Sequence, residues 1–242
     1  MALKPAKQAS TNQRQFGNQP DMEPGTYPAR VVQILDLGLQ NQRSFIPGET
    51  KKPAHEVMLT YEFVDCFMVD EEGNEIEDKP RWFSETLPWY GVHIEKATST
   101  KRYKALDADN AYDGDFAQVI GTPCNVTIAV VKKGEKTYVN ITNVTGMRKR
   151  DADKTPELVN PTKVFDIDAP DLEVFNALPE WLRDKIKGNL NYAGSVLEKA
   201  LAGNQEPEPK AETKKAKPAP EPKKEAAPEP EDEADESEEN PW

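Results

Sequence analysis

Apolar and polar residues alternate along the first 150 positions in a way that predicts β-strands. In the run around residue 60, apolar residues occupy every second position from Val57 to Phe63, which is the period of a half-buried strand. The last two runs flank the basic turn at 132–136 and give the clearest hairpin in the chain. The predicted strands lie at residues 27–39, 55–69, 81–87, 124–131 and 137–144.

A short helix is predicted between the third and fourth strands. Residues 98–106 (TSTKRYKAL) lack strand alternation, begin with helix-capping residues and contain good helix formers. Five strands with a helix in this place match the order of an OB-fold, a small Greek-key barrel that binds oligonucleotides and oligosaccharides. We therefore predict a mainly β, five-stranded, OB-fold-like Greek-key barrel, although the pattern alone leaves other five-stranded barrels open.

The composition changes after the strands. Between 168 and 202, prolines stand where a first helical turn accepts them and apolar residues recur at roughly helical spacing. Beyond Gly203 almost no bulky apolar group is present to offset an ordering entropy of about 1–2 kcal/mol per residue. We predict a flexible N-terminal arm, an OB-fold-like domain, a linker with a helical annex packed on the barrel, and a disordered tail, at residues 1–22, 23–150, 151–202 and 203–242.

The formal net charge of −12 is distributed unevenly. Residues 229–242 hold eight acidic residues and no Lys or Arg, and removing those eight from the total leaves −4 on residues 1–228. Two-thirds of the net negative charge therefore belongs to the tail. The net charge does not exclude a nucleic-acid partner for the rest of the chain.

The two cysteines, Cys66 and Cys124, stand in separate strand-like runs. This placement favours buried free thiols over a disulfide or a metal site and indicates a reducing compartment. No segment approaches the ~18 apolar residues of a membrane span, and the first twenty residues lack the apolar core of a signal peptide. We expect a soluble, cytoplasmic protein.

Catalytic motifs are missing from the sequence. Its two histidines, His55 and His93, stand in no metal-ligand spacing, and there is no P-loop, G-x-S-x-G elbow or paired-cysteine site. The acidic residues at 70–78 are of the type that binds divalent metal, but they cluster in a predicted turn, which favours a solvated hairpin. We expect no enzymatic activity, no cofactor and no metal site.

Three segments combine cations with aromatic rings, as single-stranded DNA grooves do. Of these, residues 101–104 stand out because three cations flank one ring. The alternative is that the rings are core residues and the lysines are solvated, and for any one ring the two interpretations are evenly balanced. The predicted DNA contacts are Arg81, Trp82, Trp89, Tyr90, Lys101, Arg102, Tyr103, Lys104, Lys132, Lys133, Lys136 and Tyr138.

The acidic tail closes on a single large ring. Such tails commonly serve as solubilising spacers, but an exposed Trp on an unfolded segment suits insertion into a partner's pocket beside basic residues. The residues expected to bind partner proteins are Glu238, Glu239, Pro241 and Trp242.

These features together resemble a family. The closing EENPW is similar to the acidic-aromatic tips of single-stranded DNA-binding proteins of replication, and the runs PGTYPARVVQILDLGLQ, EVMLTYEFVD, DKPRWFSETLPWY and TSTKRYKALD look like those of phage-encoded members with an OB-fold. PELVNP and LPEWLRDKIKGNL look like their C-terminal extension. The resemblance spans about 24–202 plus the tail and implies the fold and the role. In one departure, residues 137–147 carry only Tyr138 where an aromatic pair often lines the binding sheet.

The leading hypothesis is sequence-independent binding of single-stranded DNA in the host-cell cytoplasm. Such a protein protects replication, recombination or repair intermediates and recruits partner proteins through its tail. Two alternatives remain open, a viral structural or scaffold protein with a solubilising tail and a metal-dependent nuclease. The sequence leaves the oligomeric state open, homo-oligomers included.

Overall fold

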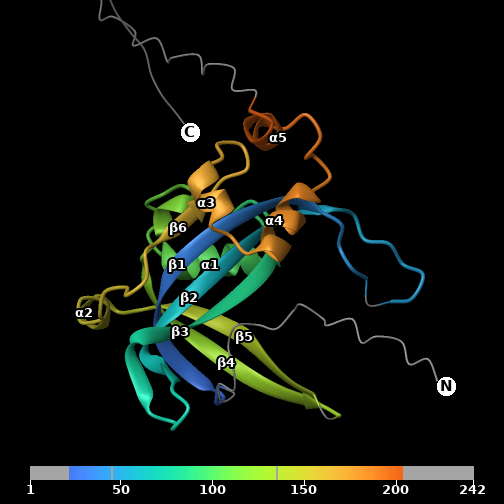
Figure 1. Cartoon of the computed structure of the whole chain (residues 1–242). Coiled ribbons are helices and arrows are strands. Elements are labelled where there is room, and N and C mark those ends of the chain that lie inside the picture. The colour runs from blue at the N-terminus through green and yellow to red at the C-terminus, as the bar shows by residue number, and fades with distance from the viewer. Residues whose placement is uncertain (1–21, 45, 135, 204–242) are drawn as a thin grey trace, which may run out of the picture. The chain divides into compact units, whose positions relative to one another are not determined.

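The computed structural model describes residues 22–44, 46–134 and 136–203, with the backbone alone for Lys133 and Lys136. These residues form a mainly β structure (Figure 1). Each predicted strand run falls within an observed strand, and the predicted helix at 98–106 is α1. The strands are β1 (Gly25–Gln40), β2 (Ala54–Val69), β3 (Glu75–Pro88), β4 (Pro123–Lys133), β5 (Lys136–Gly146) and β6 (Lys163–Phe165). The helices are α1 (Thr98–Leu106), the 3₁₀ helix η1 (Phe116–Val119), α2 (Lys149–Ala152), α3 (Leu172–Asn176), α4 (Glu180–Lys187) and α5 (Val196–Leu201).

β1 is the central strand of a six-stranded sheet with the order β3-β2-β1-β4-β5. One edge of β1 pairs with β2 along Ala29–Gln40. The other edge pairs first with β4, at Gly25–Arg30, and then with β6 in parallel, at Gln33–Leu35. β6 was not predicted, because three residues are too few to show a periodicity.

The sheet does not close into a barrel, which corrects the predicted closed five-stranded architecture. β3 and β5 are the two ends of the strand order, and no pairing joins them within the described residues. Helix α1 contacts both strands instead. The gap that a closing ladder would fill is therefore covered by a helix, and the sheet keeps two edges.

Two hydrophobic clusters lie on opposite faces of β1. In the first, Ala29, Val31 and Ile34 pack with residues of β2, α1 and η1. In the second, Leu35 and Leu37 pack with β6 and the helices α3, α4 and α5. A register shift between Val31 and Gln33 moves the inward positions along β1 by one residue, which places Ile34 with Ala29 and Val31 in the first cluster and Leu35 and Leu37 in the second.

The segment that follows β5 is held to the outer face of the sheet by a cross-strand pair of charged residues, Arg30 and Glu62. The Arg30 guanidinium donates to the carbonyls of Pro156 (2.7 Å) and Thr155 (2.9 Å), and to that of Gly121 (2.9 Å). The buried carboxylate of Glu62 accepts from the backbone N–H groups of residues 159 (2.7 Å) and 160 (3.2 Å) and from the side-chain amide of residue 160 (2.7 Å). These bonds satisfy backbone groups of an irregular segment that would otherwise be unpaired.

The far end of β1 fits closely against the annex. Gly38 has a φ of +71°, and a Cβ atom there would lie 2.8 Å from the side chain of the buried Asn189. The next residue along, Leu190, donates its N–H to the carbonyl of Leu39 at 2.8 Å. Only glycine fits this position, because both the backbone angle and the space exclude a side chain.

We expect Glu62→Ala to lower the free energy of unfolding by at least about 2 kcal/mol, because it removes three hydrogen bonds that a buried carboxylate accepts from residues 159 and 160. Urea unfolding followed by circular dichroism measures the change. Glu157→Ala is the matched control, since that carboxylate bonds Arg30 at 3.2 Å but is almost fully exposed, and it should shift stability by no more than about 0.5 kcal/mol. Equal losses in the two variants would contradict the role of Glu62 as a clamp.

Candidate nucleic-acid interface

The segment that stood out in the sequence, residues 101–104, divides between the interior and the surface. Arg102 is only 4% exposed, and its Nε lies 2.8 Å from Oε1 of Glu85 while a terminal nitrogen lies 3.1 Å from Oε2. The phenol of Tyr61 donates to the same carboxylate at 2.9 Å. The Arg102 charge is thus neutralised inside the protein and is not presented to a phosphate.

Tyr103 is likewise a core residue. Its hydroxyl donates to Oδ2 of Asp107 at 2.7 Å and accepts from the backbone N–H of Gly114 at 2.8 Å. Burial, together with the bond to Asp107, raises the pKa of Tyr103 to about 12. We therefore remove Arg102 and Tyr103 from the predicted contacts. Lys101 and Lys104 lie on the exposed face of α1, and Lys104 pairs with the exposed Glu95 at 3.3 Å.

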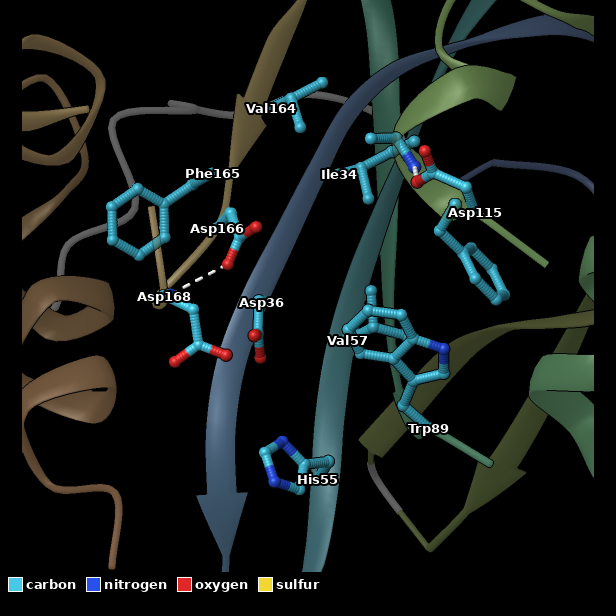
Figure 2. A pocket seen from close by; sticks show the side chains of 12 residues that line it. Ile34, Asp36, His55, Val57, Trp89, Asp115, Val164, Phe165, Asp166 and Asp168 are labelled. Atoms are coloured by element: carbon cyan, nitrogen blue, oxygen red, sulfur yellow. Dashed lines mark hydrogen bonds between the residues drawn. The ribbon is translucent and has the colours of Figure 1, made fainter. Parts of the chain in front are cut away.

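Trp89 lies in an acidic environment. Its ring packs edge-on against Phe116, with centroids 5.6 Å apart, and lines a cavity of about 260 Å³. Figure 2 shows the carboxylates of Asp36, Asp166 and Asp168 around the same cavity. Burial raises the pKa of Asp36, and these two neighbouring carboxylates raise it further. A site lined by these carboxylates repels phosphate, so Trp89 is a poor candidate for stacking on DNA.

Trp82 and Tyr138 are the predicted rings that point away from the core on the outer face of the sheet. Their strand neighbours Phe83 and Val139 pack against the first cluster, so alternation turns the two rings outward. Trp82 is 42% exposed and Tyr138 is 45% exposed.

These two rings lie on strands at opposite ends of the strand order, β3 and β5. Trp82 pairs in register with Glu62, whose carboxylate holds residues 159–160 over the sheet. The structure therefore places both rings on one face but does not join them in one groove.

The remaining predicted contacts are scattered. Tyr90 is exposed in the loop before α1, and Lys132 is exposed at the end of β4. Arg81 is half-buried. Burial raises the pKa of the Cys66 thiol, and the nearby Arg81 charge offsets part of this rise. The side chains of Lys133 and Lys136 lie outside the described part of the structure, as do the tail residues Glu238, Glu239, Pro241 and Trp242 and the arm at 1–21.

Both cysteines are free, as predicted, but Cys66 is only half-buried, where a buried thiol was expected. Cys124 is fully buried in the first cluster, and burial raises its pKa to about 12. That thiol is therefore protonated at neutral pH and serves as a small core side chain.

One set of cations was missed in the sequence. The loop between β1 and β2 exposes Arg43, Lys51 and Lys52, with Ile46 exposed near its tip. Phe45 stands two positions after Arg43, but these cations were not singled out in the sequence. Their signal was the excess of basic over acidic residues in a loop between two long strands.

No protein-family model matches the chain, and comparison with curated proteins finds no similar sequence. Among the helices that the structure describes, none is long and apolar enough to cross a membrane. The described residues also include no group of three or more His, Cys, Asp or Glu side chains arranged to hold a metal ion.

The division of residues 101–104 can be tested by paired substitutions. Arg102→Ala should lower the free energy of unfolding by about 3 kcal/mol, because it leaves the carboxylate of Glu85, which is only 11% exposed, without its counter-ion. Lys101→Ala should stay within about 0.5 kcal/mol of the parent. Urea unfolding of both variants measures the difference. An Arg102→Ala protein as stable as the parent would contradict the buried ion pair and make Arg102 a surface cation.

Proposed function

We propose that this chain is a non-enzymatic protein that binds single-stranded DNA without sequence preference, and that it is of the phage-encoded type with an OB-fold-like architecture. The strand order supports this proposal. β1 is shared between β2–β3 on one side and β4–β5 on the other, and α1 lies between β3 and β4 in sequence. This is the strand succession of an OB-fold, here without a ladder between β3 and β5 in the described residues.

The proposal rests on the positions of the exposed aromatic rings and cations in this strand arrangement. OB-folds bind oligonucleotides on the face of strands 2 and 3 and with the loops that follow strands 1 and 4. Trp82 lies on the outer face of β3, and Tyr138 lies beside the β4–β5 turn. Arg43 and Lys52 lie in the β1–β2 loop, and Lys132 precedes the β4–β5 turn. Figure 1 shows both loops extending beyond the sheet.

The chemistry of these groups accounts for binding without sequence preference. Every base has a π-face, so stacking on Trp82 and Tyr138 accepts any base. Lysine and arginine neutralise phosphates, which are the same in every sequence. The acidic cavity beside Trp89 repels the backbone, so we place the DNA path on the outer face and the two loops.

The acidic tail completes the proposed function. Single-stranded DNA that is coated during replication, recombination or repair must still be reached by other proteins, and a terminal Trp next to acidic residues offers such proteins a docking point. The tail residues lie outside the described part of the structure, so this role rests on their sequence. We place the protein in the cytoplasm of the host cell.

Substitutions at the two rings test the interface. Trp82→Ala and Tyr138→Ala should each weaken binding of oligo-dT by about 1–3 kcal/mol, roughly 5- to 150-fold, through lost stacking. Lys132→Ala should reduce the slope of log K against log salt concentration by about 0.7, for every oligonucleotide alike. Fluorescence anisotropy of labelled oligonucleotides at several salt concentrations measures both effects.

Trp181→Ala is the matched control for the ring substitutions. Trp181 is 54% exposed on α4, which contacts the end of β1 and carries neither of the two proposed stacking rings, so its loss should leave DNA affinity unchanged. If the parent fails to bind oligo-dT even at low salt, the proposed function is wrong. If Trp181→Ala weakens binding as much as Trp82→Ala does, the proposed face is wrong.

Deletion of residues 229–242 should have two opposite effects. The eight acids compete with DNA phosphates at an effective concentration that can approach the millimolar range, so the truncated protein should bind DNA more tightly. Salt should shrink this gain, because screening acts over about 10 Å at 0.1 M. The same deletion should abolish co-precipitation of replication or recombination proteins.

Trp242→Ala separates the two effects. It removes the apolar anchor and no charge, so it should reproduce most of the loss of partner binding with little change in DNA affinity. A truncated protein with unchanged DNA affinity at low salt, together with a Trp242→Ala protein that keeps its partners, would reduce the tail to a solubilising extension.

A further inference from the structure

β5 ends the sheet, and within the described residues its only strand neighbour is β4. An edge strand presents unpaired N–H and C=O groups that can pair with another strand. Proteins usually prevent such pairing with charged residues, proline or β-bulges on the edge. The two edges of this sheet differ sharply in these safeguards.

The edge formed by β3 is protected. It carries charged residues and a proline in the run Glu75–Arg81, and its pairing with β2 is irregular between Glu62 and Met68. By contrast, β5 has no charged residue and no proline over the nine positions 137–145 (TYVNITNVT). These nine residues are mostly β-branched or aromatic, which favours strand pairing.

The accessible part of this edge is the half nearest the turn. Pairing with β4 is regular from Lys136 to Ile141, and the register shifts only beyond Ile141. At the other end, α1 approaches so closely that a Cβ atom on Gly146 would lie 2.6 Å from the carbonyl oxygen of Ala105. Figure 1 shows the turn end of the β4–β5 hairpin pointing away from α1. Within the part of the chain that the structure describes, residues 136–141 are therefore a regular strand segment with no further strand along their outer edge.

We propose that two copies of this chain associate by antiparallel pairing of their β5 edges, around a two-fold axis at Val139. The axis places Tyr138 opposite Asn140 of the second copy and Thr137 opposite Ile141 of the second copy. Residues that face each other then belong to the same face of the sheet, because 138 and 140 both lie on the outer face. No pair of like charges is created, and the two edges are identical, as a two-fold interface requires.

An exposed apolar pair favours a second copy as the occupant. Tyr138 pairs in register with Val131 of β4, and both side chains are more than two-fifths exposed on the outer face. In the proposed dimer Asn140 of the second copy faces Tyr138, and the two Tyr138 rings are diagonal neighbours across the axis, within reach of each other as aromatic side chains are at this spacing.

The expected association is weak. A six-residue edge buries less than the about 1,200–2,000 Å² of a standard interface, so we expect a dimer that forms with rising concentration. This inference does not depend on DNA binding, since the edge pairs in the free protein.

Sedimentation equilibrium of the full chain without DNA, over roughly 1–300 µM, tests the pairing in a range suited to small interfaces. The parent should pass from monomer to dimer. Tyr138→Lys/Asn140→Lys should weaken dimerisation at least tenfold, because the introduced ammonium groups face each other across the axis. Tyr138→Lys/Asn140→Glu alters the same two exposed positions but sets opposite charges face to face, and should dimerise at least tenfold more tightly than the double-lysine protein.

Three results would overturn the pairing. If the parent stays monomeric over the whole concentration range, no second copy pairs with the β5 edge and the proposal is wrong. Equal dimerisation of the parent and both variants places the interface elsewhere. Equal loss in both variants refutes the two-fold register at Val139. Oligo-dT binding at low salt, measured separately, reports on the proposed function, so failure of one proposal is distinguishable from failure of the other.

Discussion

The structure depends on one strand, β1, being hydrogen-bonded along both edges and packed on both faces. Its first half pairs with β4 and its second half with β6, while β2 follows the other edge. A strand so enclosed cannot slide, because a shift of one residue would expose both sets of core side chains at once. The register shift after Val31 sets which residues face each cluster, since it turns Ile34 toward the first and Leu35 toward the second.

Charged residues in this protein are used for assembly as well as for solubility. Glu62 and Arg30 bind the backbone of the segment after β5, and Glu85 binds Arg102 of α1. Each buried charge costs desolvation, and each is offset by several hydrogen bonds of good geometry. These contacts position the annex and α1, and they remove from the surface two arginines and two carboxylates that a count of charges alone would assign to it.

The remaining surface differs in charge from one region to another. The outer face carries rings, and the β1–β2 loop and the β4–β5 turn are flanked or occupied by cations, whereas the cavity between β1, β2 and β6 carries carboxylates. A polyanion is attracted to the first region and repelled by the second. The uncharged half of β5 adjoins the first region, so the edge that we propose for dimerisation would extend the same outer face from one copy to the next.

The sequence by itself determined the five long strands, the helix at 98–106, the helical character of the annex and the free cysteines, because these follow from local periodicity and composition. It did not determine which side of α1 faces the core: Lys101 and Arg102 are adjacent cations, and only the presence of Glu85 on β3 makes one of them interior. It likewise could not separate Trp82 from Trp89, or anticipate β6. Burial is set by partners that are distant in the chain, and a pattern read along one segment carries no information about them. The tertiary structure alone decided which of the predicted rings and cations reach the surface.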